Sequence, residues 1–115
     1  MSAAERASLC ARLTFTDPSQ RDDLCDETLT DTNLVAGLQY LVEHCPHGIL
    51  ITAMRSDHPT YDGGPNGHGH NAGKAVDYWT ASSSDADVVE VVVASARNPY
   101  WWTVGLGGRA KQYES

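Results

Sequence analysis

Apolar residues recur at helical spacing between Asn33 and Cys45. They fall on one face of a helix with about 3.6 residues per turn: Leu34, Leu38, Leu41 and Val42. Asp31 or Thr32 can accept the first backbone N–H groups as an N-cap, and Pro46 follows the last apolar position. The pattern predicts an amphipathic helix over 33–45.

Three shorter apolar runs are typical of strands. The run from Gly48 to Met54 is continuous, rich in β-branched residues and bounded by turn-forming residues, so it predicts a buried strand. Lys74–Trp79 alternates in character and predicts a second strand. Asn98 and Pro99 interrupt the chain before Tyr100–Gly105, which predicts a third strand ahead of a glycine-rich turn.

The remaining segments predict helices and loops. Ala3–Leu13 suits a short helix, whereas Asp17–Asp31 is rich in acids and turn formers and predicts no regular element. Residues 57–69 hold prolines, glycines and histidines and predict an irregular loop. Ser84–Asp87 resembles a capping box, in which Ser84 covers the first amides of a helix continuing over Val88–Arg97.

These elements predict a single domain over residues 1–115. Residues 1–31 form a variable N-terminal segment of this domain, and residues 32–115 form its core. The order of helices, strands and helix suggests an α+β fold with a small, mainly antiparallel sheet packed by helices.

Charge and cysteine content limit the partners and the compartment. With 15 acidic and 8 basic residues the net charge is -7, which repels phosphate backbones and excludes duplex nucleic acid as a partner. Three cysteines without a C-x-x-C pair fit reduced thiols, although a bridge between Cys10 and Cys25 stays open. No run approaches the roughly 20 apolar residues of a membrane helix. We therefore expect a cytoplasmic protein that does not insert into membranes.

The segment from His68 to Trp79 carries candidate metal chemistry. Zinc needs imidazole nitrogen and carboxylate oxygen to converge at about 2 Å, and a turn over 71–73 would let His70 and Asp77 meet. The small side chain of Ala75 would let the next layer of the fold pack closely against this segment. The same pattern also fits a polar loop that enters a strand, with Asp77 bonded to backbone amides. Spacing alone does not separate these two interpretations.

Two motifs together resemble a known family. Arg55-Ser56-Asp57 is followed by a loop and then by His70-x-x-Gly73-x-Ala75-x-Asp77, and the later run over 98–108 is rich in aromatic residues and glycine. This combination resembles the D-alanyl-D-alanine carboxypeptidase family of zinc peptidases, which shares its fold with the Hedgehog signalling domain and includes phage endolysins. The likeness runs from about Leu34 to the C-terminus.

The resemblance implies a Hedgehog/DD-peptidase-like fold and a set of site residues. His70 and Asp77 match the first two zinc ligands, and Arg55 matches the arginine that orients the substrate. In the family a third ligand histidine and an acidic general base follow the glycine-rich turn, where this chain has no matching residues. His68 or His58, or a second copy of the chain, would have to complete the zinc site.

Aromatic residues beside the motif are candidates for ligand contact. Tyr78, Trp79 and Trp102 can stack on a base or a sugar ring, although aromatic residues on strands more often divide between core and interface. Backbone amides of the turn at 105–108, with Arg109, could hold a phosphate, but such glycine clusters are usually only turns.

Two functions follow from this pattern. The first is a phage-related module that binds or sequesters a small peptide or nucleotide-derived ligand without hydrolysing it, as a homo-oligomer whose interface extends the pocket. The second is an active zinc peptidase acting on cell-wall-type peptides. The missing ligand and base favour the first. A shortened form of a longer enzyme is the third alternative.

Overall fold

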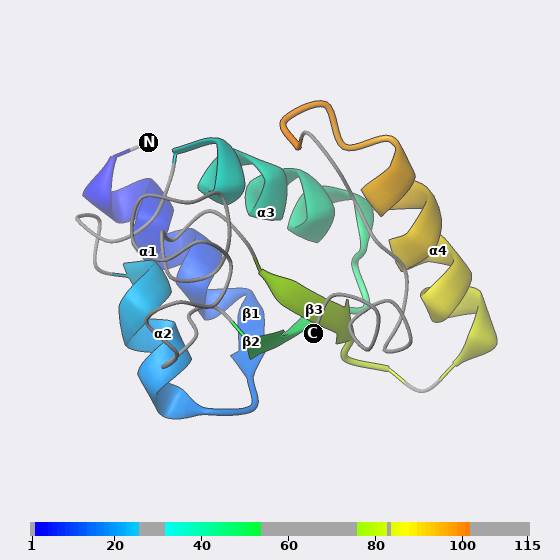
Figure 1. The fold of residues 1–115 in the computed structure, drawn as a ribbon, viewed down its shortest axis with the longest axis horizontal. Helices are drawn as coiled ribbons and strands as arrows, with labels where there is room; N and C mark the ends of the chain where they lie inside the picture. Colours follow the sequence, from blue (N-terminus) through cyan, green and yellow to red (C-terminus); the bar gives the residue numbers. More distant parts are fainter. Residues whose placement is uncertain (1, 26–31, 54–75, 83, 102–115) are drawn as a thin grey trace, which may run out of the picture.

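The computed structural model describes residues 2–25, 32–53, 76–82 and 84–101. These residues form four helices and three strands, as Figure 1 shows: α1 (Ala3–Ala11), β1 (Leu13–Phe15), α2 (Pro18–Cys25), α3 (Thr32–His44), β2 (Ile49–Ala53), β3 (Asp77–Thr80) and α4 (Asp85–Ala96). The α+β class predicted from the sequence is confirmed. None of these helices is both long enough and apolar enough to cross a bilayer.

The three strands form one sheet with β2 in the centre. β1 pairs with β2 in parallel, with Leu13 opposite Ile49, and β3 pairs with β2 in antiparallel, with Thr80 opposite the same Ile49. The sheet is therefore mixed rather than mainly antiparallel. The difference arises because the N-terminal segment supplies an edge strand that the sequence pattern did not predict.

The N-terminal segment contributes to the core. α1 ends at Ala11 rather than at Leu13, because Leu13 starts β1 and is buried against the core. α2 occupies part of the acid-rich stretch for which no element was predicted, and its Leu24 is fully buried. Residues 2–25 thus join the sheet and the core that the rest of the chain builds.

The core lies between the sheet and its helices. Ile49 and Ile51 of β2 are fully buried. The apolar face predicted for α3 is confirmed, since its four predicted positions are all buried: Leu34, Leu38, Leu41 and Val42. These side chains form one continuous cluster with residues from α1, α2 and α4.

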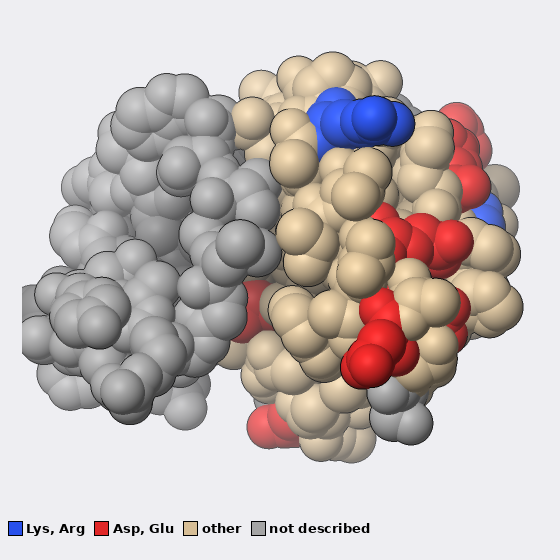
Figure 2. Space-filling model, turned by 90° about the vertical axis from the view of Figure 1, so that its right-hand side faces the viewer, with Lys and Arg blue, Asp and Glu red and all other residues tan. Residues whose placement is uncertain are grey.

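α4 packs beside α3 and against β3, on the right of Figure 1. It begins at Asp85, directly after the predicted N-cap position Ser84. Ser84 is its N-cap residue, but the Ser84 side chain makes no capping hydrogen bond, so the predicted capping box is wrong. The acids of the first turn still favour the positive end of the helix dipole. Figure 2 shows acidic groups below a basic group on the molecular face that carries α4.

The segment after α4 does not begin with a strand. Pro99 and Tyr100 form a turn in which Asn98 Oδ1 accepts the Tyr100 N–H. Asn98 Nδ2 donates to the carbonyl of Gly37 at 3.0 Å, which ties this turn to α3. The predicted third strand therefore does not start at Tyr100, and its residues 102–105 lie outside the described residues.

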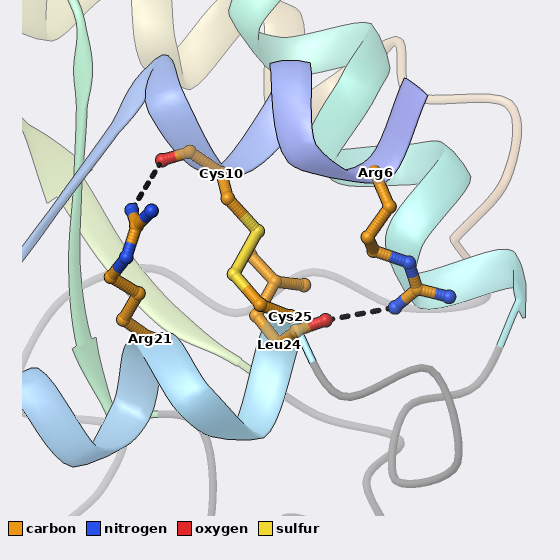
Figure 3. The surroundings of a disulfide bond; sticks show 5 residues. All are labelled: Arg6, Cys10, Arg21, Leu24 and Cys25. Carbon is orange, nitrogen blue, oxygen red and sulfur yellow. Dashed lines mark hydrogen bonds between the residues drawn. A yellow bond between two sulfur atoms is a disulfide. The ribbon is translucent and has the colours of Figure 1, made fainter. Parts of the chain in front are cut away.

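A disulfide joins Cys10 of α1 to Cys25 of α2 (Figure 3). Two arginines reinforce the connection: Arg6 donates to the Leu24 carbonyl at 2.9 Å, and Arg21 donates to the Cys10 carbonyl at 3.2 Å. The sequence favoured reduced thiols for these cysteines. The structure corrects that prediction, because α1 and α2 pack against each other and bring the two cysteines together. Cys45 is a free, buried thiol.

Candidate functional site

The candidate site is at the end of the sheet where β2 stops and β3 starts. Asp77, the first residue of β3, pairs with Ala53, the last residue of β2. The register shifts between Ile51 and Ala53, so Thr52 forms a β-bulge. Bulges re-aim side chains at sheet edges, and here the bulge places Ala53 rather than Thr52 opposite Asp77.

Strand alternation sorts the β3 side chains onto two faces. Val76 and Tyr78 pack against the core, and Thr80 is buried. Asp77 and Trp79 therefore belong to the other face, and the Trp79 side chain is 41% exposed. Asp77 and Val76 thus point to opposite faces of the sheet.

Tyr78 has internal partners on the core side. Its hydroxyl bonds to Ser95 Oγ of α4, and its ring lies 5.4 Å from the ring of Trp101, centroid to centroid. Burial raises the pKa of the Tyr78 hydroxyl above its usual value, which the Ser95 hydrogen bond opposes. Tyr78, one of the aromatic residues predicted to contact a ligand, thus links the sheet to α4.

Most of the predicted site lies outside the described residues. This holds for Arg55, for His68 and His70, and for Trp102. Of the predicted zinc ligands, Asp77 alone is described. Within residues 2–25, 32–53, 76–82 and 84–101, no three His, Cys, Asp or Glu side chains gather at a point where they could hold a metal ion.

A second polar feature lies on the outer side of α3 and was not predicted. An open hollow of about 310 Å³ is lined by side chains from α1, from α3 and from the turn after α4: Glu5, Ala36, Gln39, Tyr40, Glu43 and Tyr100. The His44 ring stacks on Tyr40 at 4.0 Å between centroids. The sequence signal that could have indicated this hollow is the polar face of the helix predicted over 33–45.

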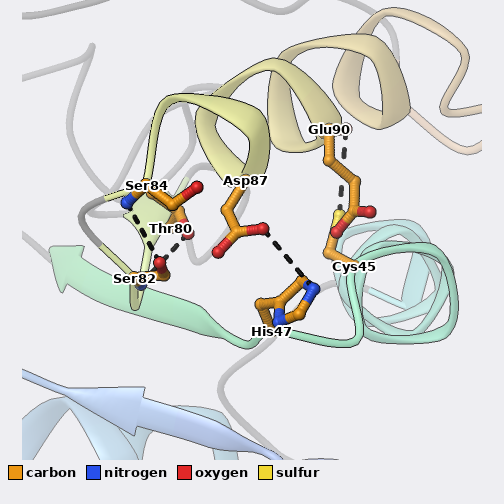
Figure 4. A network of polar contacts seen from close by, with 7 residues as sticks. All are labelled: Cys45, His47, Thr80, Ser82, Ser84, Asp87 and Glu90. Carbon is orange, nitrogen blue, oxygen red and sulfur yellow. Dashed lines mark hydrogen bonds and ion pairs between the residues drawn. The ribbon is translucent and has the colours of Figure 1, made fainter.

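Polar contacts also join the loop before β2 to α4 (Figure 4). His47 Nε2 lies 3.5 Å from Asp87 Oδ1. The buried Cys45 thiol lies 4.0 Å from the Glu90 carbonyl, and burial, with a smaller contribution from the Glu90 charge, raises the pKa of Cys45 to about 11. Because burial favours its protonated form, the Cys45 thiol is a poor nucleophile.

No protein-family model, curated protein or solved structure matches this chain.

Proposed function

We propose that this chain is a small-ligand-binding module on a Hedgehog/DD-peptidase-like scaffold, phage-related, and that it holds its ligand without hydrolysing it. The observation that carries the proposal is the pairing of Asp77 with Ala53 at the bulged end of the sheet. Asp77 and Trp79 occupy the same face there, opposite the packed core. A carboxylate and a partly exposed indole ring thus lie on one surface.

The sequence joins the other candidate residues to this end of the sheet. Arg55 follows Ala53 by two residues, and the His68–His70 segment leads into β3 at Asp77. A guanidinium group suits a carboxylate or phosphate of the ligand, while Trp79 suits an apolar or planar group. A terminal peptide carboxylate or a nucleotide-derived molecule satisfies both requirements.

Zinc is a secondary part of the proposal. Asp77, His70 and His68 have the donor chemistry that zinc accepts, and bound zinc would polarise a carbonyl group of the ligand. The described residues hold only one of these donors. We therefore favour binding over peptidase activity.

The test uses the full chain with two soluble probes, D-alanyl-D-alanine and adenosine diphosphate. We expect a saturable change in tryptophan fluorescence with at least one probe. Asp77→Asn and Trp79→Phe should abolish it, whereas Asp22→Asn, which removes an exposed acid on α2, should leave it unchanged. Product analysis by mass spectrometry should show an intact probe. No saturable binding of either probe, or release of free D-alanine, would refute the proposal.

The disulfide bears on the compartment expected from the sequence. Disulfides persist in oxidising compartments and are rare in the cytosol, so the Cys10–Cys25 bond counts against the cytoplasmic location proposed from composition. Thiol trapping in the producing cells, followed by mass spectrometry, would decide the question. Alkylation of Cys10 and Cys25 without prior reduction would support the cytoplasm.

A further inference from the structure

The β-bulge at Thr52 is held by hydrogen bonds from α2 and the residues before it. The Gln20 side chain of α2 donates from Nε2 to the Thr52 carbonyl at 3.1 Å, and the Thr16 hydroxyl donates to the same carbonyl at 3.4 Å. Ala53, which follows the bulge, pairs with Asp77. Gln20 therefore helps to fix the part of β2 that lies opposite Asp77.

The helix that presents Gln20 is short, polar and tied at its last residue. α2 has eight residues, and isolated helices shorter than about 12 residues are marginal in water. Among its described side chains, Leu24 is apolar and fully buried. Cys25 at its end is bonded to Cys10 of α1, as Figure 3 shows. The disulfide thus stabilises the helical state of α2, and with it the orientation of Gln20.

We propose that the Cys10–Cys25 disulfide is a redox-sensitive switch that controls the geometry of the sheet end at Asp77. In the oxidised chain, α2 is helical and Gln20 is bonded to the Thr52 carbonyl. In the reduced chain, α2 loses its helical structure and this hydrogen bond breaks. β1 and β2 stay paired, because their ladder does not include α2.

The reductant is a dithiol, such as dithiothreitol or a protein with two neighbouring thiols. One of its thiolates attacks Cys25 Sγ, because Cys25 is half-buried whereas Cys10 is 1% exposed. The S–S bond breaks, and Cys10 leaves as a thiolate that takes up a proton. The second thiolate of the reductant then attacks the mixed disulfide and releases Cys25. Two electrons and two protons pass to the chain, and the dithiol becomes a disulfide.

The effect on ligand binding rests on the function proposed above. Asp77 is one of the groups proposed to contact the ligand, so a shift of its strand partner Ala53 moves that carboxylate. Loss of one hydrogen bond changes an equilibrium constant by about fivefold. We therefore expect the reduced chain to bind its ligand about fivefold more weakly than the oxidised chain.

The first test needs no ligand and compares backbone amide NMR spectra of the full chain before and after treatment with dithiothreitol. Alkylation and mass spectrometry count the thiols that are released. The resonances of Thr52, Ala53 and Asp77 should shift on reduction, while those of residues 91–95 in α4 should not. Unmoved resonances at Thr52 and Asp77, a disulfide that resists dithiothreitol, or simultaneous loss of the α4 signals overturns the proposal.

A variant tests the role of Gln20 without touching the disulfide. Gln20→Ala removes the hydrogen bond to Thr52, so in the oxidised chain it should shift the Thr52 and Asp77 resonances in the direction that reduction shifts them. Gln39→Ala is the matched control on α3, because Gln39 Nε2 donates to Glu43 at 2.8 Å instead. It should leave both resonances in place. Wild-type resonances in Gln20→Ala overturn the coupling through α2.

The second test titrates D-alanyl-D-alanine and adenosine diphosphate into both redox states. The oxidised chain should bind about fivefold more tightly, and Cys10→Ser/Cys25→Ser should bind like the reduced chain with or without dithiothreitol. Equal affinity in the two states overturns the redox switch and leaves the proposed function standing. Absence of binding in both states refutes the proposed function instead, and the NMR comparison then decides the switch by itself.

Discussion

α2 contacts β1 and α4 contacts β3, the two edge strands of the sheet, and the two helices are held there by different means. α2 is a polar helix. Among its described side chains, Leu24 is apolar and fully buried. A disulfide and hydrogen bonds to backbone carbonyls attach it, including that from Gln20 to Thr52 at 3.1 Å. α4 is rich in valine and is held by packing against α3 and β3.

The contrast shows how local composition decides the kind of attachment a helix needs. α2 cannot bury enough apolar surface to offset the entropy of ordering it, so a covalent link and directed polar contacts supply the difference. α4 has more apolar surface than the core accepts, and Val89 and Val93 stay exposed. Reduction of the Cys10–Cys25 disulfide should therefore destabilise α2 before the other helices. Substitutions that alter apolar packing should instead destabilise the region around α4.

The largest expected effect is loss of the disulfide. Cys10→Ala/Cys25→Ala removes a cross-link spanning 15 positions, and loop-closure entropy of that size corresponds to about 3 kcal/mol of unfolding free energy. Urea denaturation measures the loss. Wild-type protein in a reducing buffer should behave in the same way.

Hydrogen exchange under native conditions then tests the comparison between the two helices. Amides of α2 should lose protection on reduction while those of α4 keep theirs. Equal loss in both helices, or protection of α2 unchanged after reduction, would contradict separate modes of attachment.

The next effect concerns the packing around α3. Gly37 lies under the Trp101 ring, and a Cβ added at Gly37 would overlap the indole Nε1, which donates to the Leu34 carbonyl at 3.3 Å. Alanine gains about 1 kcal/mol of helix propensity over glycine, but overpacking costs about 1–3 kcal/mol. We expect Gly37→Ala to lower the unfolding free energy by about 1 kcal/mol and to shift tryptophan fluorescence.

Ala36→Gly is the matched control for Gly37→Ala. It changes propensity at the neighbouring position of α3 without adding atoms, so it should cost about 1 kcal/mol and leave Trp101 in place. A stabilised Gly37→Ala chain with unchanged fluorescence would show that the contact between Gly37 and Trp101 is looser than described.

The loss of stability at alkaline pH tests the contact of Cys45, which directly follows α3, with Glu90 of α4. Its pKa rises from 9.0 to about 11 in the folded chain, so the unfolded chain loses its thiol proton first as the pH rises. The stabilisation is fully present below pH 9 and is lost as the pH rises toward 11; it amounts to about 2 kcal/mol. Urea denaturation at several pH values should show a shallower loss for Cys45→Ala. If the unfolding free energy falls equally steeply with pH in the wild type and in Cys45→Ala, the raised pKa of Cys45 is contradicted.

The smallest effect is expected at the link between β3 and α4. Ser95 Oγ donates to the Val91 carbonyl at 2.7 Å, so the Tyr78 hydroxyl is the donor to Ser95. Tyr78→Phe removes this donor and leaves Ser95 bonded, which should cost about 1 kcal/mol. Thermal unfolding measures the change, and Ser95→Ala, which also strands the Tyr78 hydroxyl, should cost more. The reverse order would contradict this donor assignment.

Elements with a strong local pattern were predictable from the sequence. Helical spacing identified α3 to within one residue at each end, and the continuous apolar run identified β2. The prediction of β3 began at Lys74, whereas the strand begins at Asp77; Lys74 and Ala75 lie outside the described residues. Of the predicted site residues, the structure describes Asp77, Tyr78 and Trp79, all within the predicted strand.

Elements defined by distant partners were not predictable in this way. β1 has three residues, too few to show a period, and its pairing with β2 depends on contacts far away in the sequence. α2 lacks an apolar face, although Pro18 at its first position is a recognised helix-start signal. The convergence of His70 with Asp77 stays a prediction.

The parallel pairing of β1 with β2 has a consequence for synthesis on the ribosome. Leu13 emerges long before its partner Ile49, so the first strand to be made must wait for the second before any sheet can form. Cys10 and Cys25 both precede Ile49 and need no part of the sheet to meet. The nascent chain can therefore form the Cys10–Cys25 disulfide early. Residues 2–25 can then dock as a preassembled unit once β2 has been translated.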